Sequence, residues 1–512
     1  METTILVEKE TSNTYLGHPK GLFYLFFAEL WERFSFYGMK ALLMLYMTQK
    51  LIFSDHNAFG VFAAYMSLVY VTPLFGGMIA DKIIGYRKAI MLGGVLMAIG
   101  HFLLSFETPI FFYASLAIII VGNGFFKPNI SSFVGLLYPV GDKRRDSGFT
   151  IFYLGVNVGG AIAPLICSWL AISYGWHYGF AMAGIGMLFG LFMFYRGMKV
   201  GVFGEKGKIP KKEVYNQKRF GIKQGKLINI LSFLVVPIFA VLIVFHQYEH
   251  YLVGIVFLLI ATILFFIYRK VSKEEKRRLL AVVYFVLLGS LFWAIFEQAG
   301  SSVTLFASRN VNLIGINAAQ TNSINSGFIM LLAIPFSWLW TYLDRKKINP
   351  NAAVKFGIGM FLLGLGFLIF GISGHFSDAF ARTPMIFLFI GYFVLTVGEL
   401  FLSPIGLSKM EALSPAKMVA FIIGIWYSAS FFGHFFAGKI AQLTTKVETS
   451  SESSWLDSIV HFFTGISNEN FLNENFQQLY GYVSTFASFG LLSIVIGIVA
   501  ILISPWIKKL MV

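Results

Sequence analysis

Charged residues are scarce in this chain of 512 residues. They make up 13% of it, whereas hydrophobic residues make up 57%. Because soluble domains contain about 25% charged residues, this composition leaves no room for a large water-exposed domain. Negative charge is scarcer still, since 25 Asp and Glu stand against 40 Lys and Arg. Such an excess of positive charge could suggest a nucleic-acid partner, but its distribution along the chain argues against one.

The chain also lacks several features of enzymes and secreted proteins. Its single cysteine, Cys167, excludes an intrachain disulfide. Neither a His-Glu-x-x-His run nor a Gly-x-Ser-x-Gly turn occurs, so two common hydrolase arrangements are missing. The first 20 residues have no apolar core like that of a cleavable signal peptide. We therefore expect no enzyme activity, no metal site and no cofactor, and residues 1–20 are expected to form a cytoplasmic tail.

Long apolar runs, by contrast, recur from residue 21 to residue 506. Each is long enough to cross a hydrocarbon core about 30 Å thick at a rise of about 1.5 Å per residue. The sequence therefore predicts an all-α polytopic membrane protein. The fourteen predicted transmembrane helices cover residues 21–50, 57–80, 89–106, 109–138, 148–174, 177–195, 227–245, 251–268, 279–307, 317–343, 354–373, 383–408, 418–442 and 479–506.

Positive charge indicates how these helices are oriented. With the N-terminus inside, the predicted cytoplasmic segments contain 32 of the 40 Lys and Arg, and the outer segments contain only five. Lys and Arg gather on the cytoplasmic side of membrane proteins. We therefore expect both termini to be cytoplasmic. The lipid bilayer is an expected partner, and no nucleic-acid partner is expected.

The longest cytoplasmic loop, 197–226, is strongly basic and divides the helices into two sets. Six predicted helices precede it within 21–196. The next two, within 227–270, carry no charged residue in their apolar runs and are interpreted as an inserted hairpin. Six more follow within 277–507, with a polar periplasmic loop at 443–478. Two six-helix bundles are typical of secondary transporters, which bind substrate at the interface between the two halves.

Ionisable residues inside the predicted helices indicate where the chemistry lies. A charge near the bilayer centre costs at least about 2.5–3.5 kcal/mol, so such residues normally face a cavity or a partner. The helix at 21–50 places its ionisable residues on one face, within an arc of about 140°. A polar seam that only joins helices is the alternative, although hydroxyl or amide groups would join them at lower cost. The seven candidates are Glu29, Glu32, Arg33, Lys40, Lys127, Glu297 and Glu399.

Depth along the helices predicts two ion pairs between the bundles. Lys40 and Glu297 both lie in the outer half of their helices, and Lys127 and Glu399 lie at a similar depth slightly inside the midpoint. If Lys40 with Glu297 closes the periplasmic side and Lys127 with Glu399 closes the cytoplasmic side, alternating access amounts to breaking one ion pair while the other forms. Breaking a buried pair costs about 3–5 kcal/mol unless a proton or a charged substrate compensates. The groups expected to couple protons are Glu29, Glu32, Arg33, Lys127 and Glu297.

Five motifs resemble, in order, those of the proton-dependent oligopeptide transporters of bacterial type, a family of the major facilitator superfamily. They are ELWERFSFYG (29–38), GNGFFKPN (122–129), FYLGVNVG (152–159), FWAIFEQ (292–298) and GELFLSP (398–404), and GGMIADKIIGYRK (76–88) resembles the loop signature of the superfamily. The resemblance implies the major facilitator fold and a monomer in the bacterial inner membrane. It also implies a symporter that imports di- and tripeptides with protons, driven by the proton gradient alone.

A short peptide is a zwitterion with a variable middle, so its two ends must be recognised. We expect Glu399 to bind the amino end, and Lys40 and Lys127 to bind the carboxylate. Asn157 and Asn325 can bind the peptide amide, since an amide group both donates and accepts. The other expected substrate-binding residues are Tyr37, Tyr70, Trp293, Ser403 and Trp426. For Tyr70, Trp293, Trp426 and Asn325, ordinary helix packing is the alternative.

Several positions depart from the family's pattern. Phe36 replaces the first tyrosine of the first motif, and Phe296 stands where some bacterial relatives have a second glutamate. Lys40 stands where arginine is frequent, so a point charge replaces a bidentate fork. His434 is expected to be a packed histidine rather than a proton relay.

The alternative cargo is another small zwitterion or anion, such as an amino-acid derivative or nitrate. A passive channel is the alternative class, although paired charges would block a pore.

Overall fold

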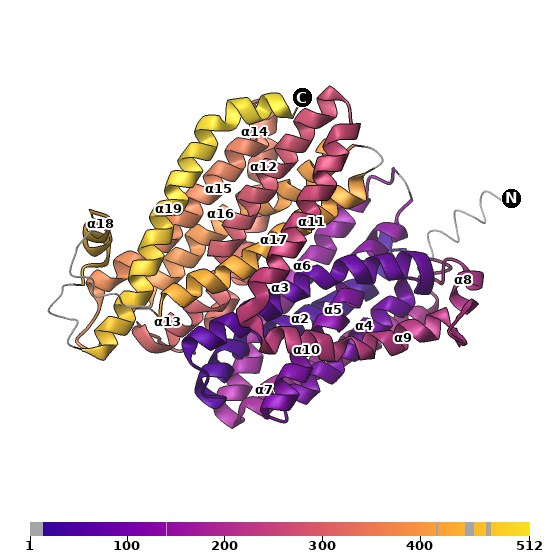
Figure 1. The fold of residues 1–512 in the computed structure, drawn as a ribbon, viewed down its shortest axis with the longest axis horizontal. Coiled ribbons are helices and arrows are strands. Elements are labelled where there is room, and N and C mark those ends of the chain that lie inside the picture. The colour runs from indigo at the N-terminus through magenta and orange to yellow at the C-terminus, as the bar shows by residue number, and fades with distance from the viewer. Residues whose placement is uncertain (1–13, 140, 416–417, 446–454, 467–472, 512) are drawn as a thin grey trace. The chain divides into compact units, whose positions relative to one another are not determined.

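Helices form most of the described chain (Figure 1). The computed structural model describes residues 14–139, 141–415, 418–445, 455–466 and 473–511, and the side chains of residues 403, 404, 407, 419–421 and 455–457 also lie outside the described set. The chain divides into two compact units. Unit 1 consists of Met1–Leu42 and Leu68–Val244, and unit 2 consists of Leu43–Ser67 and Phe245–Val512. The division passes through the helices α2 and α3 and between the two arms of the inserted pair.

Unit 1 contains the N-terminal helices and the basic loop. Its helices are α2 Lys20–Leu45 as far as Leu42, α3 Asp55–Ile79 from Leu68, the π-helical turn η2 Ala80–Ile84, α4 Tyr86–Leu104, α5 Pro109–Leu137, α6 Arg145–Tyr174, α7 Trp176–Val200, α8 Lys212–Asn216, α9 Gln224–Leu234 and α10 Val236–Val244. Two antiparallel strand pairs accompany them, β1 Thr14–Tyr15 with β2 His18–Pro19 and β3 Lys218–Arg219 with β4 Ile222–Lys223.

Unit 2 contains the remaining helices, the end of α2 from Leu43 and the start of α3 as far as Ser67. Its helices are η1 Tyr46–Lys50, η3 His246–Tyr248, α11 Glu249–Lys270, α12 Lys273–Phe296, η4 Glu297–Gly300, α13 Ser302–Asn310, η5 Ala319–Asn322, α14 Ser323–Arg345, α15 Ala352–Ile372, η6 Ser373–Phe376, α16 Ile386–Leu413, α17 Val419–Leu443, α18 Trp455–Thr464 and α19 Glu474–Leu510. A parallel pair of short strands, β5 Val311–Asn312 and β6 Thr383–Pro384, completes the unit.

The fourteen predicted spans all correspond to helices, so the predicted all-α membrane fold is confirmed. Among the described residues, eleven helical segments are long and apolar enough to cross a membrane. The helices α2, α16 and α17 also have the required length, with 26, 28 and 25 residues. The protein is therefore a multi-pass membrane protein.

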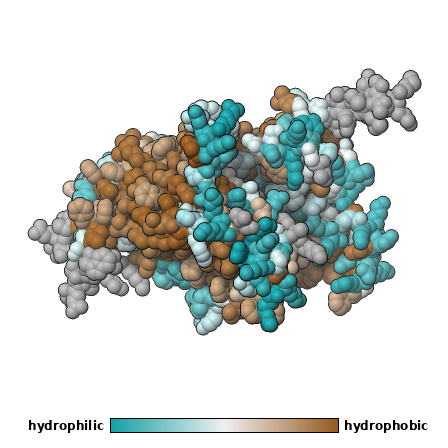
Figure 2. Space-filling model, turned by 90° about the horizontal axis from the view of Figure 1, so that it is seen from above, coloured by the Kyte–Doolittle hydropathy of each residue, from teal (hydrophilic) through white to brown (hydrophobic). Residues whose placement is uncertain are grey.

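Exposed apolar side chains cover a broad face of the surface (Figure 2). Helix α14, for example, leaves Leu331, Ile334 and Trp338 exposed at 70%, 80% and 68%. Patches of this extent are rare on soluble monomers. In a helix whose backbone groups bond within the helix, such side chains are compatible with contact to lipid.

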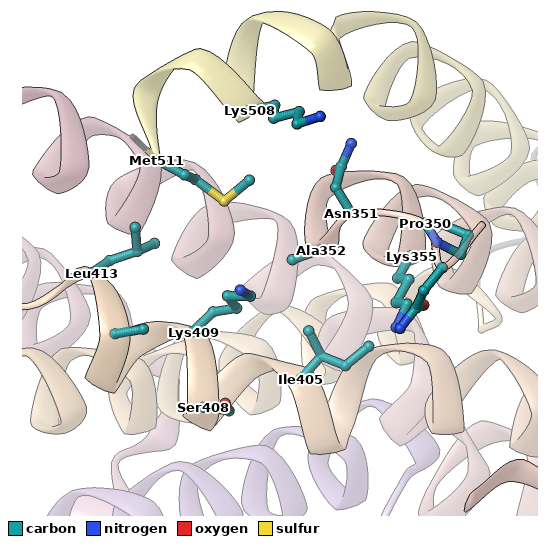
Figure 3. Close-up of a pocket in the computed structure, with 12 residues that line it drawn as sticks. Pro350, Asn351, Ala352, Lys355, Ile405, Ser408, Lys409, Leu413, Lys508 and Met511 are labelled. Atoms are coloured by element: carbon teal, nitrogen blue, oxygen red, sulfur yellow. The ribbon is translucent and has the colours of Figure 1, made fainter. Parts of the chain in front are cut away.

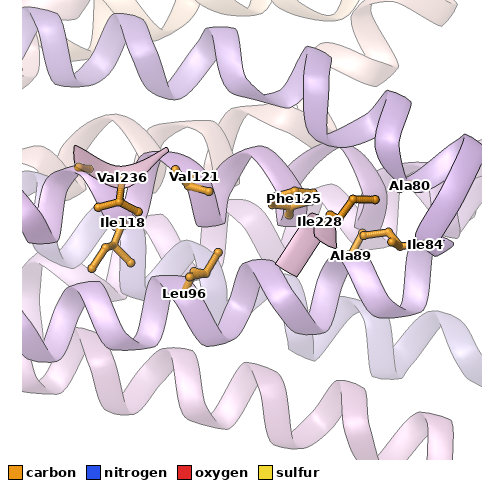
Figure 4. Close-up of a cluster of buried hydrophobic side chains, with 10 residues drawn as sticks. Ala80, Ile84, Ala89, Leu96, Ile118, Val121, Phe125, Ile228 and Val236 are labelled. Carbon is orange, nitrogen blue, oxygen red and sulfur yellow. The ribbon is translucent and has the colours of Figure 1, made fainter. Parts of the chain in front are cut away.

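The first arm of the inserted pair packs on unit 1 through an apolar cluster. Ile228 of α9 and Val236 of α10 join Leu96 of α4 and Val121 and Phe125 of α5 (Figure 4). These five side chains are at most 9% exposed. The contact is apolar throughout, which agrees with the absence of charge in this arm of the predicted hairpin.

The second arm of the inserted pair, α11, belongs to unit 2. The ring of Phe257 on α11 lies 6.3 Å from the ring of Phe432 on α17. The arm begins two residues earlier than the predicted start at residue 251, so that Glu249 lies inside its first turn.

Two predicted segments differ from the structure in their detail. The helix predicted for 279–307 is interrupted, because the 3₁₀ turn η4 separates α12 from α13. The segment predicted as a loop at 443–478 contains the helix α18, whose Val460 packs with Leu368 and Ala487. This helix was missed because the segment was interpreted from its polar composition, and a helix of ten residues is too short to span a membrane.

Candidate functional site

Three ionisable side chains of α2 form a buried cluster in unit 1. Glu29, Glu32 and Arg33 are 3%, 0% and 3% exposed. Arg33 donates to both carboxylate oxygens of Glu32, with Nη2 at 2.7 Å from Oε1, and its Nε lies 3.2 Å from Oε1 of Glu29. The second oxygen of Glu29, Oε2, is buried without a hydrogen-bond partner among the described groups. One guanidinium group therefore faces two carboxylates.

Lys127 of α5 supplies a second positive charge to this cluster. Its Nζ lies 4.3 Å from the centre of the Tyr70 ring on α3, and Lys127 interacts electrostatically with Glu29 and Glu32. Two carboxylates and two cations then balance when both acids are ionised. Lys40, further along α2, also lies within electrostatic range of Lys127.

Glycines in the GNGFFKPN motif bring α5 close to its neighbours. A Cβ at Gly76 of α3 would lie 1.9 Å from the carbonyl oxygen of Gly124, and a Cβ at Gly93 of α4 would lie 2.5 Å from that of Gly122. Because no side chain fits at these crossings, the three helices pack backbone to backbone. The glycines thereby position Lys127, which follows Gly124 by three residues.

Helix α6 packs against α2 in the same way. A Cβ at Gly159 would lie 2.4 Å from the carbonyl oxygen of Leu30. Asn157, two residues earlier, is 6% exposed, and its Nδ2 donates to the carbonyl oxygen of Tyr153 on its own helix at 3.0 Å. Tyr37 and Lys40 of α2 are partly buried. The predicted residues of unit 1 thus lie on the helices α2, α3, α5 and α6.

In unit 2, Glu399 lies near the middle of α16 and is 8% exposed. Its Oε2 accepts a hydrogen bond of 3.0 Å from Nδ2 of Asn325 on α14, and the same amide donates to Oγ1 of Thr396 at 3.0 Å. None of the ion pairs found among the described residues includes Glu399. A buried carboxylate in mid-helix is thus held by a neutral partner.

Glu297 stands at the point where α12 changes into the turn η4. It is 9% exposed, and its Oε2 lies 3.8 Å from Nδ1 of His434 on α17, a histidine that is 2% exposed. Glu297 also interacts electrostatically with Glu399. His434 is packed, as expected, but its position beside Glu297 was not foreseen. Sequence periodicity gives no signal for a contact between residues so far apart.

The predicted aromatic residues of unit 2 pack within the unit. Trp426 is 8% exposed and lies against Gly289 and Gly406, where an added Cβ would be 3.2 Å and 2.2 Å from its indole. The Trp293 ring lies 5.4 Å from the Phe296 ring in an edge-to-face arrangement. In this structure Trp426 therefore fills the space left by two glycines.

Each predicted ion pair takes one residue from each unit. Lys40 and Lys127 belong to unit 1, and Glu297 and Glu399 belong to unit 2. Both pairs, and a substrate site shared by the units, stay predictions. Ser403 has a side chain outside the described residues.

The sequence reasoning missed two polar groups of unit 2. Arg309 at the end of α13 binds Asp55 in the first turn of α3 through two N–H groups, with Nη2 at 2.8 Å from Oδ1, and it donates to the Tyr482 hydroxyl at 3.1 Å. Glu249 is 9% exposed in the first turn of α11 and interacts with Ser67 and Lys439. An acidic residue before an apolar run is a known helix-start signal and could have placed Glu249 in α11.

Comparison with known proteins identifies the family. A model of the POT family (PTR2) matches residues 87–456. An uncharacterized transporter of Bacillus subtilis (strain 168), YclF, is 33% identical over 521 aligned residues that cover 99% of this chain and 98% of that one. The peptide transporter YePEPT of Yersinia enterocolitica is 36% identical over 453 residues, covering 83% and 88%.

A solved structure extends the comparison to the fold. The crystal structure of a POT family transporter in complex with a thioalcohol-conjugated peptide has a TM-score of 0.77 and 31% identity, and the match covers 97% of this chain and 98% of that one. These relatives are transporters. The chain therefore belongs to the POT family of membrane transporters.

Proposed function

We propose that the chain is a symporter that imports di- and tripeptides together with protons across the bacterial inner membrane by alternating access, with both termini in the cytoplasm. The observation that carries this proposal is that the buried carboxylate of Glu399 accepts its hydrogen bond from a neutral amide. A carboxylate in the middle of a membrane helix costs at least about 2.5–3.5 kcal/mol, yet its hydrogen bond comes from the neutral amide of Asn325. A substrate with an ammonium group supplies the missing positive charge.

The relatives support a peptide as that substrate. The Yersinia relative is named a peptide transporter, and the solved POT family structure contains a conjugated peptide. The free amino end of a short peptide is an ammonium group, whereas nitrate or another simple anion offers none. The neutral partner of Glu399 therefore favours a peptide over an anion.

The cluster on α2 provides a route for proton coupling. With Glu29 and Glu32 ionised, their charges balance those of Arg33 and Lys127. When Lys127 turns to the carboxylate of an incoming peptide, the cluster is left with an excess negative charge. A proton that binds to a carboxylate oxygen of Glu29 or Glu32 restores the balance. Proton binding and peptide binding then favour each other, which is the requirement for symport.

Purified protein in liposomes tests the proposal. An inward proton gradient is imposed, and the accumulation of a labelled dipeptide is measured with and without a protonophore. We expect accumulation above the outside concentration, and we expect its loss when the gradient is dissipated. Equilibration without accumulation would indicate a channel. Competition by nitrate or single amino acids, but not by dipeptides, would indicate a different cargo.

A further inference from the structure

A basic cavity in unit 2 has no role in the proposed transport cycle. Its volume is about 510 Å³, and it lies between the start of α15 and the ends of α16 and α19 (Figure 3). Each of the three helices contributes one lysine, namely Lys355, Lys409 and Lys508. The positive-inside pattern of the sequence assigns all three to the cytoplasmic side.

Among the described residues, none that lines this lysine cavity is acidic. The ion pairs found among the described residues include none of the three lysines. Asp344 at the end of α14 interacts electrostatically with Lys355, but its Oδ1 accepts a hydrogen bond of 2.6 Å from Nδ2 of Asn349. The cavity thus concentrates positive charge.

Lys355 is the most buried of the three lysines. It is 8% exposed, and its Nζ lies 3.8 Å from the centre of the Trp340 ring. The ring satisfies one side of the ammonium group by a cation–π contact. A buried cation that forms no ion pair among the described residues is costly, and an anion in the cavity would lower that cost.

The first turn of α15 adds donors to the same cavity. Asn351 and Ala352, at the start of this helix of 21 residues, line the cavity. Asn351 caps the helix by accepting from the Val354 N–H at 3.1 Å. The other N–H groups of a first helical turn have no partner within the helix, and they carry partial positive charge that favours anions.

Aromatic side chains place this end of unit 2 at the level of lipid headgroups. Trp506 lies within one turn of Lys508 on α19 and is 60% exposed, and Tyr342 lies near the end of α14 and is 43% exposed. Trp and Tyr are enriched where a membrane helix meets the interface. The lysine cavity is thus expected at the depth where lipid phosphates occur.

We infer that the lysine cavity binds the phosphate group of an anionic membrane lipid of the cytoplasmic leaflet. Basic pockets between transmembrane helices on that side are suited to such headgroups. Lysine acts on a phosphate as a point charge and needs no fixed orientation. The lipid would thereby join α15, α16 and α19 at their cytoplasmic ends.

A double variant, Lys409→Gln with Lys508→Gln, tests this inference. Lys355 is left intact because it packs on Trp340. Lys509→Gln is the matched control, since Lys509 is the next residue of α19 and does not line the cavity. Phosphatidylglycerol binding to the purified full chain is titrated by native mass spectrometry, with phosphatidylcholine for comparison.

We expect the double variant to bind phosphatidylglycerol about 30-fold more weakly, the loss expected for two lysines near an anionic lipid surface. The control should bind it within about twofold of the unchanged chain, because its charge lies outside the cavity. Dipeptide binding by the double variant, which should be unchanged, verifies that it folds. Equal phosphatidylglycerol affinity in all three proteins would overturn the inference.

A second arm distinguishes a lipid from a free anion. Inorganic phosphate is added at millimolar concentration, and its ability to displace phosphatidylglycerol is measured. We expect no displacement, since the acyl chains add burial that inorganic phosphate lacks. Full displacement would show that the cavity takes free phosphate and would overturn the lipid assignment.

Discussion

Replacing Lys127 by alanine should separate proton coupling from peptide binding. Lys127 interacts electrostatically with Glu29, Glu32 and Arg33 inside unit 1. Without it, two carboxylates face one guanidinium group, and the buried cluster carries an excess negative charge. A proton held permanently by the cluster removes that charge, but such a proton cannot be released in each cycle.

The size of the effect follows from the cost of that charge. An uncompensated charge left by breaking a buried pair costs about 3–5 kcal/mol. At about 1.36 kcal/mol for each factor of ten, proton release becomes at least about 100-fold less favourable. We therefore expect gradient-driven uptake to fall by at least about 100-fold. Exchange of peptide for peptide needs no proton release. It should lose only the contact of Lys127 with the peptide carboxylate, which Lys40 is also expected to bind, and should therefore fall far less than uptake.

Proteoliposomes measure both quantities for each variant. Uptake of labelled dipeptide under an imposed proton gradient reports coupling, and exchange with internal unlabelled dipeptide reports binding and reorientation. Lys143→Ala is the control, since Lys143 is exposed beyond the end of α5. Uphill uptake at an unchanged rate in Lys127→Ala would remove Lys127 from the mechanism. Equal loss of exchange and uptake would assign Lys127 to peptide binding alone, without a role in proton coupling.

Three further variants test unit 2. Glu399→Gln should weaken binding of peptides with a free amino end at least about tenfold more than binding of N-acetylated peptides, because an ammonium group loses its counter-charge; titration calorimetry measures both. Asn325→Ala removes a hydrogen bond to a charged group and should lower the free energy of unfolding by about 1.5–3 kcal/mol. This loss should be smaller when dipeptide is bound, and thermal unfolding with and without dipeptide measures the difference. Arg309→Leu should lower it by about 1–3 kcal/mol, since Asp55 and Tyr482 lose their shared partner.

Each of these variants has a matched comparison. Asn322→Ala is the control for Asn325→Ala. Asn322 lies about one turn from Asn325, but its amide donates to the hydroxyl of Thr304 at 3.1 Å rather than to a carboxylate. Dipeptide should therefore not reduce its effect on stability. Equal loss of free and acetylated peptides in Glu399→Gln would refute the assignment of the amino end. Leucine at Arg309 and Asp55 together should cost less than the sum of the single changes if the pair is coupled.

The helices could be predicted because the membrane imposes a simple rule. Each spanning segment must bond its own backbone groups and expose apolar side chains, so hydropathy alone predicted segments that all correspond to helices in the structure. The ion cluster of α2 was also predictable, since Glu29, Glu32 and Arg33 are neighbours in sequence and the helical repeat places them on one face. In both cases the information is local in the chain.

Partners from distant helices could not be predicted in this way. Asn325 and Glu399 are 74 residues apart, and Arg309 and Asp55 are 254 apart. Periodicity identifies the polar face of a helix but not the helix that covers it. The start of α11 was predicted two residues too late because Glu249 is charged and was assigned to the loop, although an acidic residue before an apolar run is a helix-start signal. In the structure it is buried against Ser67 and Lys439, which no local pattern reveals.

The interruption of α12 at Glu297 explains several polar residues that have no assigned role in transport. Breaking a membrane helix frees backbone carbonyl groups, each of which is costly in lipid unless it finds a donor. Here Thr304 Oγ1 donates to the carbonyl oxygen of Ala299 at 2.9 Å, and Gln298 Nε2 donates to that of Ala294 on α12 at 3.1 Å. Ser302 in turn donates to Oε1 of Gln298 at 2.7 Å.

These side chains stabilise a 3₁₀ turn in the middle of a spanning segment, where such turns often mark a hinge. Glu297 and its neighbour His434 therefore lie at the point of the segment where its direction can change. The carboxylate belongs to the first residue of the turn, and its Oε2 lies 3.8 Å from Nδ1 of His434. The interruption thus places a residue that the sequence predicts to couple protons at the point where the hydrogen bonding of the segment changes.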